Sequence, residues 1–105
     1  MQLHPLKLVT IVGESVIMED IAKEAVILGA SGYSLIDVTG QGSRSARNVL
    51  VVSSGSKTVK AEFVVPIDIA EKILEHISHD YFEHYACIAW LSDVQVLRGE
   101  RYIAK

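Results

Sequence analysis

The sequence predicts a small α+β domain in which two strand–helix–strand units form one antiparallel sheet with both helices on the same face. Three observations indicate this fold class. Apolar, β-branched runs alternate with two segments whose apolar residues recur at helical spacing. The elements come in the order strand–helix–strand, strand–helix–strand, which is the split βαβ, or ferredoxin-like, arrangement βαββαβ. The 105 residues suit a single domain, and 50% of them are hydrophobic, which is enough for a core.

The first strand–helix–strand unit occupies residues 6–39. Residues 6–12 are dense in aliphatic and β-branched side chains and predict a buried strand. Ser15 is the expected N-cap of a helix, and Gly29 is expected to end that helix. Residues 33–39 predict the second strand. The helix is indicated by apolar residues at helical spacing: Ile17, Ile21, Ala25 and Leu28.

The second unit follows a long loop. Residues 40–57 are rich in glycine and serine and predict that loop, with a strand-like arm at residues 49–52. Residues 59–65 alternate as in a half-buried strand, and Pro66 fits the first turn of a second helix. Residues 86–97 predict a last, long strand. The second helix is indicated by an apolar stripe: Ile69, Ala70, Ile73, Leu74 and Ile77.

Two helices on one side of the sheet leave its other face to be covered. Phe63 and Val65, or the residues between them, are expected to lie partly on that open face. An exposed apolar sheet face is usually covered by another chain. The pattern therefore predicts a homo-oligomer.

Composition and charge argue against several classes of protein. The net charge of -3 and the pI of about 5.7 do not suit a non-specific nucleic-acid binder, which needs a broad basic surface. Cys87 is the one cysteine, which fits a reducing cytoplasm, and its apolar neighbours indicate a buried structural thiol. The N-terminal residues lack the pattern of a signal peptide, and no apolar run reaches the ~18–20 residues of a membrane span. We therefore expect a cytoplasmic protein without membrane insertion.

The segment after the second predicted strand has the composition of an anion cradle. Gly40 and Gly42 let backbone N–H groups approach a phosphate, and the Ser43 hydroxyl adds a donor. The guanidinium groups of Arg44 and Arg47 can each fork onto phosphate oxygens, which favours a small anion over a polyanion. The alternative is a solvated basic hairpin loop, because short Gly/Arg patterns often match by chance.

Two common phosphate motifs do not fit this chain. Ser45 stands where the dinucleotide-binding fingerprint requires its third glycine. Ser56 separates Gly55 from Lys57, where a Walker A loop needs glycine and lysine together. The segment therefore indicates an anion site of another kind.

The element order and the position of the long loop resemble those of the PII-like signal-transduction proteins, over almost the whole chain. Residues 40–47, Gly-Gln-Gly-Ser-Arg-Ser-Ala-Arg, are similar to the Gly-x-Gly-Ser-Arg-x-x-Arg segment of PII-like proteins linked to bicarbonate transport and carboxysomes. Residues 80–86 resemble the lead-in to the last strand of those proteins. Residues 97–101, Leu-Arg-Gly-Glu-Arg, look like a shortened form of the Arg-Thr-Gly-Glu stretch that ends the core of nitrogen-type PII proteins.

The resemblance implies a single PII-like domain, residues 1–105, that forms a homotrimer and binds adenine nucleotides in clefts between subunits. The loop between the second and third strands corresponds to the T-loop, which is expected to be mobile when empty and to order when ligand binds. The resemblance implies that these residues bind the nucleotide: Gly40, Gly42, Ser43, Arg44 and Arg47 at the loop base, Arg98 and Arg101 after the last strand, and the backbone of Cys87, Ile88 and Ala89 at the adenine edge.

The resemblance also implies ligands and partners. ADP or AMP is the expected nucleotide, with cyclic AMP and ATP as alternatives. Bicarbonate is expected as a second ligand, because an arginine fork suits a small planar anion. The implied protein partner is a bicarbonate transporter or a carboxysome-associated protein.

Departures from nitrogen-type PII proteins narrow the choice of ligand. Those proteins carry Gly-x-Gly-Arg-Gln at the T-loop base, where the Gln helps to hold Mg-ATP and 2-oxoglutarate, whereas this chain has Ser43 and Arg44 there. Residues 40–58 contain no tyrosine to accept a uridylyl group, and residues 79–86 lack the glycines that precede the last strand. Cys87 stands where the bicarbonate-transport relatives have glycine. These changes argue against 2-oxoglutarate sensing and favour AMP or ADP over Mg-ATP.

Other classes of function have weaker support in the sequence. No arrangement of serine, histidine and acid indicates a catalytic site, so we expect no enzyme; a slow nucleotide hydrolase is an alternative. A metal-tolerance trimer of the CutA type has the same fold, but residues 40–44 argue against it. His76 and His79 are three positions apart, which is a weak metal signal, and a solvated helix end without metal is the favoured interpretation.

Overall fold

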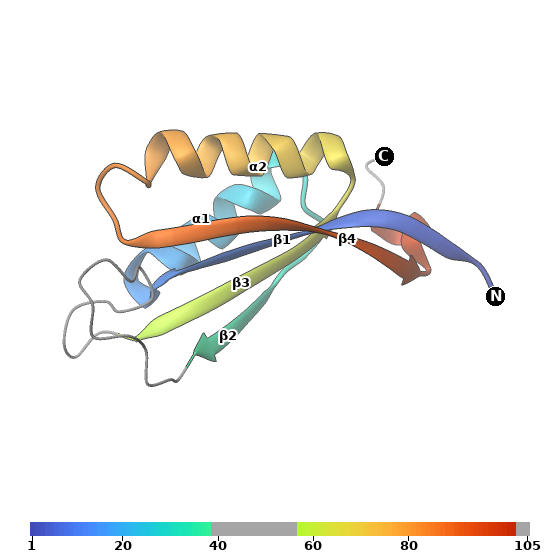
Figure 1. The fold of residues 1–105 in the computed structure, drawn as a ribbon, viewed down its shortest axis with the longest axis horizontal. Coiled ribbons are helices and arrows are strands. Elements are labelled where there is room, and N and C mark those ends of the chain that lie inside the picture. Colours follow the sequence, from blue (N-terminus) through green and yellow to red (C-terminus); the bar gives the residue numbers. More distant parts are fainter. Residues whose placement is uncertain (39–56, 103–105) are drawn as a thin grey trace.

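The fold is a four-stranded antiparallel sheet with two helices packed on one of its faces (Figure 1). The computed structural model describes residues 1–38 and 57–102. The elements are, in chain order, β1 (Leu3–Glu14), α1 (Ser15–Leu28), β2 (Ser34–Val38), β3 (Thr58–Val65), α2 (Ile67–Asp80), β4 (Cys87–Leu97) and the 3-10 helix η1 (Gly99–Tyr102). The strands lie in the order β2-β3-β1-β4. The ferredoxin-like α+β fold predicted from the element order is confirmed.

Strand β1 is longer than the sequence predicts, because partners extend its pairing at both ends. It runs from Leu3 to Glu14 rather than over residues 6–12. At its start Leu3 pairs with Leu97 of β4, and at its end Glu14 pairs with Thr58 of β3. These partners are distant in sequence, so the local apolar pattern does not reveal them.

The start of α1 is held by backbone rather than by a side chain. Glu14 is the N-cap, and no side-chain hydrogen bond caps the helix, so the predicted capping role of Ser15 is wrong. Instead, the Ser15 N–H donates to the carbonyl oxygen of Lys57 over 2.9 Å, which ties α1 to the lead-in of β3. Gly29 ends α1 as predicted, with a φ of 128° that favours glycine. Pro66 is the N-cap of α2.

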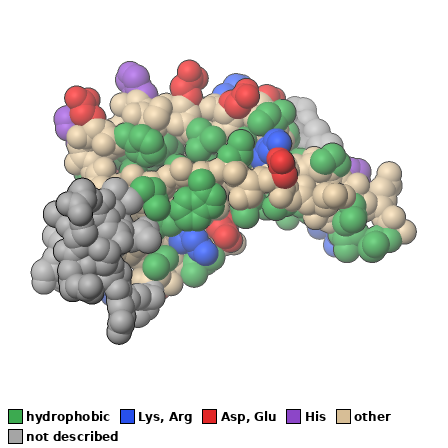
Figure 2. Space-filling view, in the orientation of Figure 1, with side chains coloured by type: hydrophobic (Ala, Val, Ile, Leu, Met, Phe, Trp, Pro, Cys, Tyr) green, Lys and Arg blue, Asp and Glu red, His purple; other side chains and the backbone are tan. Residues whose placement is uncertain are grey.

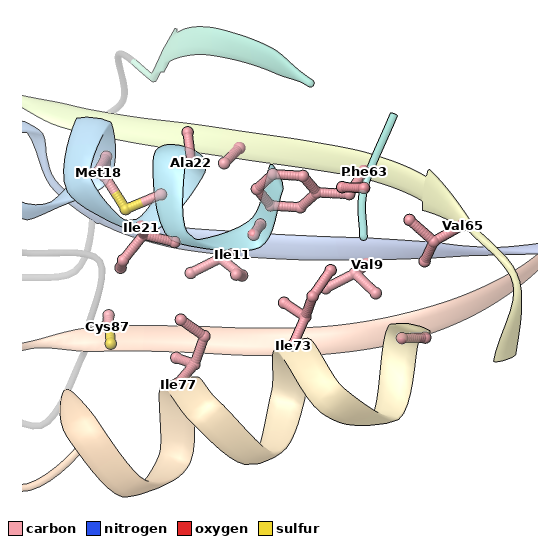
Figure 3. Packing of buried hydrophobic residues seen from close by; sticks show 14 of the residues in the cluster. Val9, Ile11, Met18, Ile21, Ala22, Phe63, Val65, Ile73, Ile77 and Cys87 are labelled. Carbon is pink, nitrogen blue, oxygen red and sulfur yellow. The ribbon is translucent and has the colours of Figure 1, made fainter. Parts of the chain in front are cut away.

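The hydrophobic core lies between the helices and the sheet (Figure 3). Val9 and Ile11 of β1 point toward the helices and are fully buried. Phe63 pairs across from Val9 and is also fully buried, as is Val65, so the prediction that these two residues lie on the open face is wrong. The buried side chains that the helices contribute include Met18, Ile21, Ala22, Ile73 and Ile77.

The open face carries the side chains that alternate with the core residues. Val64, which lies between Phe63 and Val65, is on this face, as the second alternative predicted, and Glu62 lies there too. Large apolar side chains are exposed there: Trp90, which pairs with Thr10, is 44% exposed, and Ile36 of β2 is 40% exposed. Neither α1 nor α2 covers this face (Figure 1).

The outer face of α2 is polar. Figure 2 shows acidic, basic and histidine side chains gathered over this helix, at the top of the view. Each of the two helices has 14 residues. Within residues 1–38 and 57–102, no helix is long and apolar enough to cross a membrane.

Candidate functional site

The two residues that flank the predicted anion-binding loop in the sheet are Val38 and Thr58, called the loop stems below. They lie at one end of the sheet, on the left in Figure 1. Val38, the last residue of β2, pairs with Thr58, the first residue of β3. The expected arm at residues 49–52 lies outside the described residues. The same holds for the predicted phosphate-binding residues Gly40, Gly42, Ser43, Arg44 and Arg47. Their roles stay predictions, but the paired stems establish where the loop leaves the sheet and where it returns.

The stems are surrounded by the end of β1, the start of α1 and the start of β4. Glu14 pairs with Thr58, and Gly13 pairs both with Val59 of β3 and with Cys87 of β4. Because neighbouring strands lie about 4.8 Å apart, Cys87 is about 10 Å from the β3 stem. The structure therefore brings the predicted adenine-binding segment, residues 87–89, to the end of the sheet that holds the loop stems.

Gly13 allows the close approach of β1 and β4 at this end. A Cβ at Gly13 would lie 2.9 Å from the Cβ of Cys87 and 3.4 Å from both the carbonyl oxygen of Ala86 and the Sδ of Met18. A side chain at this position would push the start of β4 outward. Sequence reasoning missed Gly13; its signal was a glycine between the apolar run of β1 and the start of the next helix.

Residues 87–89 offer backbone groups rather than side chains. Ile88 pairs with Val12 on the open face and Ala89 with Ile11 on the helix face, so their side chains point to opposite sides. Since β4 is an edge strand, one of its two edges has no strand partner within the described residues. The backbone N–H and C=O groups on that side of β4 can therefore form hydrogen bonds with the polar edge of an adenine base.

Cys87 itself is a structural thiol. Its side chain points into the core and is 7% exposed. Burial raises the pKa of the Cys87 thiol, so the group stays protonated at neutral pH and is a poor nucleophile.

Arg98 and Arg101 lie at the opposite end of the same sheet. Strand β4 runs from Cys87, beside the loop stems, to Leu97, beside the N-terminal end of β1. At about 3.3 Å per residue, Arg98 is about 36 Å from Cys87 along the strand. One copy of the chain therefore does not bring these arginines to residues 87–89 or to the loop stems.

The turn that carries the two arginines has an unusual backbone. Arg98 has a φ of 61°, a left-handed conformation that disfavours residues with a side chain. Its carbonyl oxygen accepts a hydrogen bond from the Arg101 N–H at 3.1 Å, so one turn sets both residues. Both side chains are exposed. Within the described residues, neither guanidinium forms an ion pair.

The histidines of α2 belong to a polar network between the helices. The Nε2 atom of His76 lies 2.6 Å from Glu24 Oε1 on α1, and its Nδ1 atom lies 3.5 Å from Asp80 Oδ2. The Tyr81 hydroxyl donates to both Glu24 carboxylate oxygens over 2.9 Å. Burial, and then the Glu24 carboxylate, raise the pKa of Tyr81. His79 pairs with Asp80 at the exposed end of the helix.

This network has a structural role in linking α1 to α2. Glu24 and His76 are 52 positions apart, so spacing alone does not predict their contact. In the part of the chain that the structure describes, no group of three or more histidine, cysteine or acidic residues is arranged to hold a metal ion.

A groove of about 880 Å³ lies at the start of α2, away from the loop stems. Its lining contains none of the predicted site residues. The residues that line it are Pro5, Leu6, Lys7, Pro66, Ile67, Asp93, Val94 and Gln95. Two of these lining residues, Lys7 of β1 and Asp93 of β4, form an ion pair. The groove therefore does not coincide with the candidate nucleotide site.

Comparison with known proteins gives matches over almost the whole chain. The family model described as nitrogen regulatory protein P-II matches residues 6–101. A solved protein from Thermus thermophilus, described as PII-like, is 38% identical, with 97% of this chain and 99% of that chain covered and a TM-score of 0.81.

Two solved structures of CPII from Thiomonas intermedia K12 have the same fold. CPII bound to ADP, AMP and acetate is 22% identical, with 98% of this chain and 99% of that chain covered and a TM-score of 0.81. CPII bound to ADP, AMP and bicarbonate is 23% identical, with 97% of both chains covered and a TM-score of 0.78. The resemblance to PII-like proteins inferred from the sequence is confirmed.

Proposed function

The chain belongs to the P-II family of nitrogen regulatory proteins, and from this premise we propose that it is a non-enzymatic sensor of adenine nucleotides, with ADP or AMP as its ligand. One observation carries the proposal. The loop stems and the open edge of β4 lie at one end of the sheet, and the guanidinium groups of Arg98 and Arg101, which form no ion pair with other described residues, lie at the other. These are two halves of a site that can bind a base and an anion.

The two halves meet only when copies of the chain assemble. They lie about 36 Å apart on different surfaces of one copy, so a head-to-tail contact between copies is needed to join them. Such contacts close into rings, and a homotrimer is the ring that the family resemblance implies. Each site would then take its loop and adenine edge from one subunit and its C-terminal arginines from a neighbour.

The open face of the sheet supports assembly. Trp90 and Ile36 are 44% and 40% exposed on a face that neither helix covers. Burying a fully exposed large apolar side chain contributes about 1.5–3 kcal/mol, so covering the exposed part of these two side chains contributes about 1 kcal/mol each. The exposed apolar residues thus favour the same assembly that completes the site.

In the proposed complex, the phosphate lies at the base of the T-loop. Backbone N–H groups at Gly40 and Gly42, the Ser43 hydroxyl and the guanidinium groups of Arg44 and Arg47 hold it, and adenine pairs with the backbone edge of β4. Charge-assisted hydrogen bonds contribute about 1.5–3 kcal/mol each. Two or three of them contribute about 3–9 kcal/mol. Stacking and burial of the base, and the remaining contacts, supply what is left of the about 8 kcal/mol of micromolar binding and of the entropic cost of association.

The carbon link and the partner are part of the same proposal. CPII has been solved with ADP, AMP and bicarbonate, and this chain shares its fold. Together with the Gly-x-Gly-Ser-Arg-x-x-Arg pattern, this supports a cytoplasmic sensor of inorganic carbon and adenylate state. The T-loop would report the bound ligand to a bicarbonate transporter or a carboxysome-associated protein.

Calorimetric titration with ADP, AMP, cyclic AMP and ATP, each with and without bicarbonate, tests the proposed function. We expect micromolar binding of ADP or AMP, and at least about tenfold weaker binding for Arg44→Ala. Lys72→Ala, a change at an exposed position of α2, is the matched control and should bind as the unmodified protein does. Absence of adenylate binding would overturn the proposal and favour a CutA-type trimer. Steady phosphate release from ATP would favour the hydrolase.

A further inference from the structure

Residues 3–5, at the N-terminal end of β1, form the surface against which η1 packs, and this surface is called the seat below. Gly99, the first residue of η1, is buried, and a Cβ added to it would lie 2.3 Å from the Cβ of His4 and 2.7 Å from its Cγ. The next residue, Glu100, places its Oε1 atom 3.4 Å from His4 Nε2. His4 therefore contacts two consecutive residues of η1, one by packing and one through its Nε2 atom.

Backbone pairing holds His4 in this position. Leu3 pairs with Leu97 and His4 with Val96, so β1 accompanies β4 to its last residue. Residues 3–5, which make this last stretch of pairing, precede residue 6, where the match to the family model begins. The seat is thus built by a part of the chain outside the range that the family model covers.

The seat lies directly beside the two arginines. Arg98 joins β4 to η1 with its left-handed φ of 61°. A residue with a side chain keeps such a conformation only where its surroundings impose it. Two features impose it on Arg98. Strands β1 and β4 are paired up to the preceding residue, and the following residue, Gly99, packs on His4. Arg101 is set by the same turn, through its N–H bond to the Arg98 carbonyl oxygen.

Glu100 is the remaining charged residue of this turn. Its carboxylate stands between the two arginines in the sequence and would repel a phosphate bound by them. The contact with His4 Nε2 gives this carboxylate a partner on β1. The seat therefore fixes the turn that carries the two arginines and also gives the acidic side chain a contact on the strand.

We infer that His4 is a positioning residue: by seating η1 it orients Arg98 and Arg101 toward the phosphate of an adenine nucleotide held by the neighbouring subunit. This inference rests on the proposed function and adds to it a residue that touches no ligand. It predicts that changes at the seat weaken nucleotide binding although they leave every ligand-contacting side chain in place.

Substitutions on both sides of the His4–Gly99 contact test the inference by ADP titration of the full chain. Gly99→Ala places a Cβ against His4 and should weaken ADP binding about tenfold, the factor expected for losing one charge-assisted hydrogen bond. His4→Ala removes the imidazole from the other side of the same contact and should weaken binding to a similar degree, and the two changes together should cost less than the sum of the single changes because they act on one contact. Gly32→Ala is the matched control, because nothing lies within 4 Å of the added Cβ.

Hydrogen exchange at the Arg101 amide gives a second readout that needs no ligand. In the ligand-free protein this amide is bonded to the Arg98 carbonyl oxygen, so Gly99→Ala and His4→Ala should each speed its exchange. If Gly99→Ala does not fold, His4→Ala alone carries the test, with the same expected loss of ADP affinity and faster exchange.

The outcomes separate this inference from the proposed function. If the unmodified protein binds no adenylate, both fail. If it binds ADP and the seat variants keep their affinity within twofold, only the positioning role of His4 is wrong, whether or not the Arg101 amide exchanges faster. A loss of about tenfold in both Gly99→Ala and His4→Ala, together with an unchanged Gly32→Ala control, supports the inference.

Discussion

Replacing Gly13 with alanine is expected to move the start of β4 away from β1. The added Cβ would lie 2.9 Å from the Cβ of Cys87, whereas carbon atoms in contact are ordinarily about 3.5–4.0 Å apart. The atom in the way is attached directly to the backbone, so the strand itself must shift by about 0.6–1 Å. Overpacking of this kind costs about 1–3 kcal/mol of the free energy of unfolding.

Urea unfolding followed by the fluorescence of Trp90 measures this cost at a fixed protomer concentration. Each kcal/mol should also lower Tm by about 4–8 °C for a domain of this size. ADP affinity should fall as well, because residues 87–89 are the predicted adenine edge. Gly32→Ala, which meets no atom within 4 Å, is the control and should change stability by less than about 0.5 kcal/mol.

A double-mutant cycle identifies the cause of the destabilisation. Cys87→Gly removes the Cβ that the new methyl group meets, so the combined variant should be less destabilised than the sum of the single variants by about 1 kcal/mol or more. The reasoning is refuted if Gly13→Ala is as stable as the Gly32→Ala control, or if the two substitutions are additive.

Three further predictions concern the interface, the buried thiol and the link between the helices. Trp90→Glu places a charge on the open face and should dissociate the oligomer in light scattering, whereas Lys72→Glu should not; an unchanged mass would contradict the proposed interface. Burial raises the pKa of the Cys87 thiol, so its contribution to stability is present below about pH 9 and is lost as pH rises through the folded pKa. Because the buried thiol stays protonated and shielded, its alkylation at pH 8 should be far slower in the folded than in the urea-unfolded protein, and equal rates would contradict its burial. Glu24→Ala removes the partner of His76 and Tyr81 and should cost about 1–2 kcal/mol in urea unfolding, against less than about 0.5 kcal/mol for the exposed control Glu19→Ala; equal values would exclude a stabilising network.

The fold was predictable because local patterns determine most of it. The aliphatic run of β1, the alternation of β3 and the helical stripes each indicate one element, and Gly29 ends α1 with the backbone conformation that its residue type favours. Their order then leaves few topologies with short connections. The alternation of β3 places Phe63 and Val65 on the same face as Val59 and Ala61, and the burial of all four side chains shows that this is the helix face.

The missed features depend on contacts between distant residues. The length of β1 is set by Leu97 and Thr58, and the backbone of Lys57 takes the place that Ser15 was expected to have at the start of α1. The role of Gly13 is visible only when β4 lies beside it. The local sequence of one segment does not show which distant strand lies beside it.

The candidate site was predictable only in part for a related reason. Residues 87–89 and the loop stems do lie at one end of the sheet, but Arg98 and Arg101 lie at the other. Sequence patterns can suggest which residue types bind a ligand, but they do not show whether those residues meet within one copy of the chain or between two copies. The cradle formed by residues 40–47 stays a prediction from composition and resemblance.

The most direct test of the account is a subunit-mixing experiment. Chains carrying Arg44→Ala and chains carrying both Arg98→Ala and Arg101→Ala are each expected to lose tight ADP binding. When they are unfolded together in equal amounts and refolded, random assembly should return about one quarter of the sites to full affinity, because each site takes its loop from one copy and its arginines from another. If no high-affinity ADP binding returns in the mixture, the proposal that neighbouring copies share the nucleotide site is contradicted.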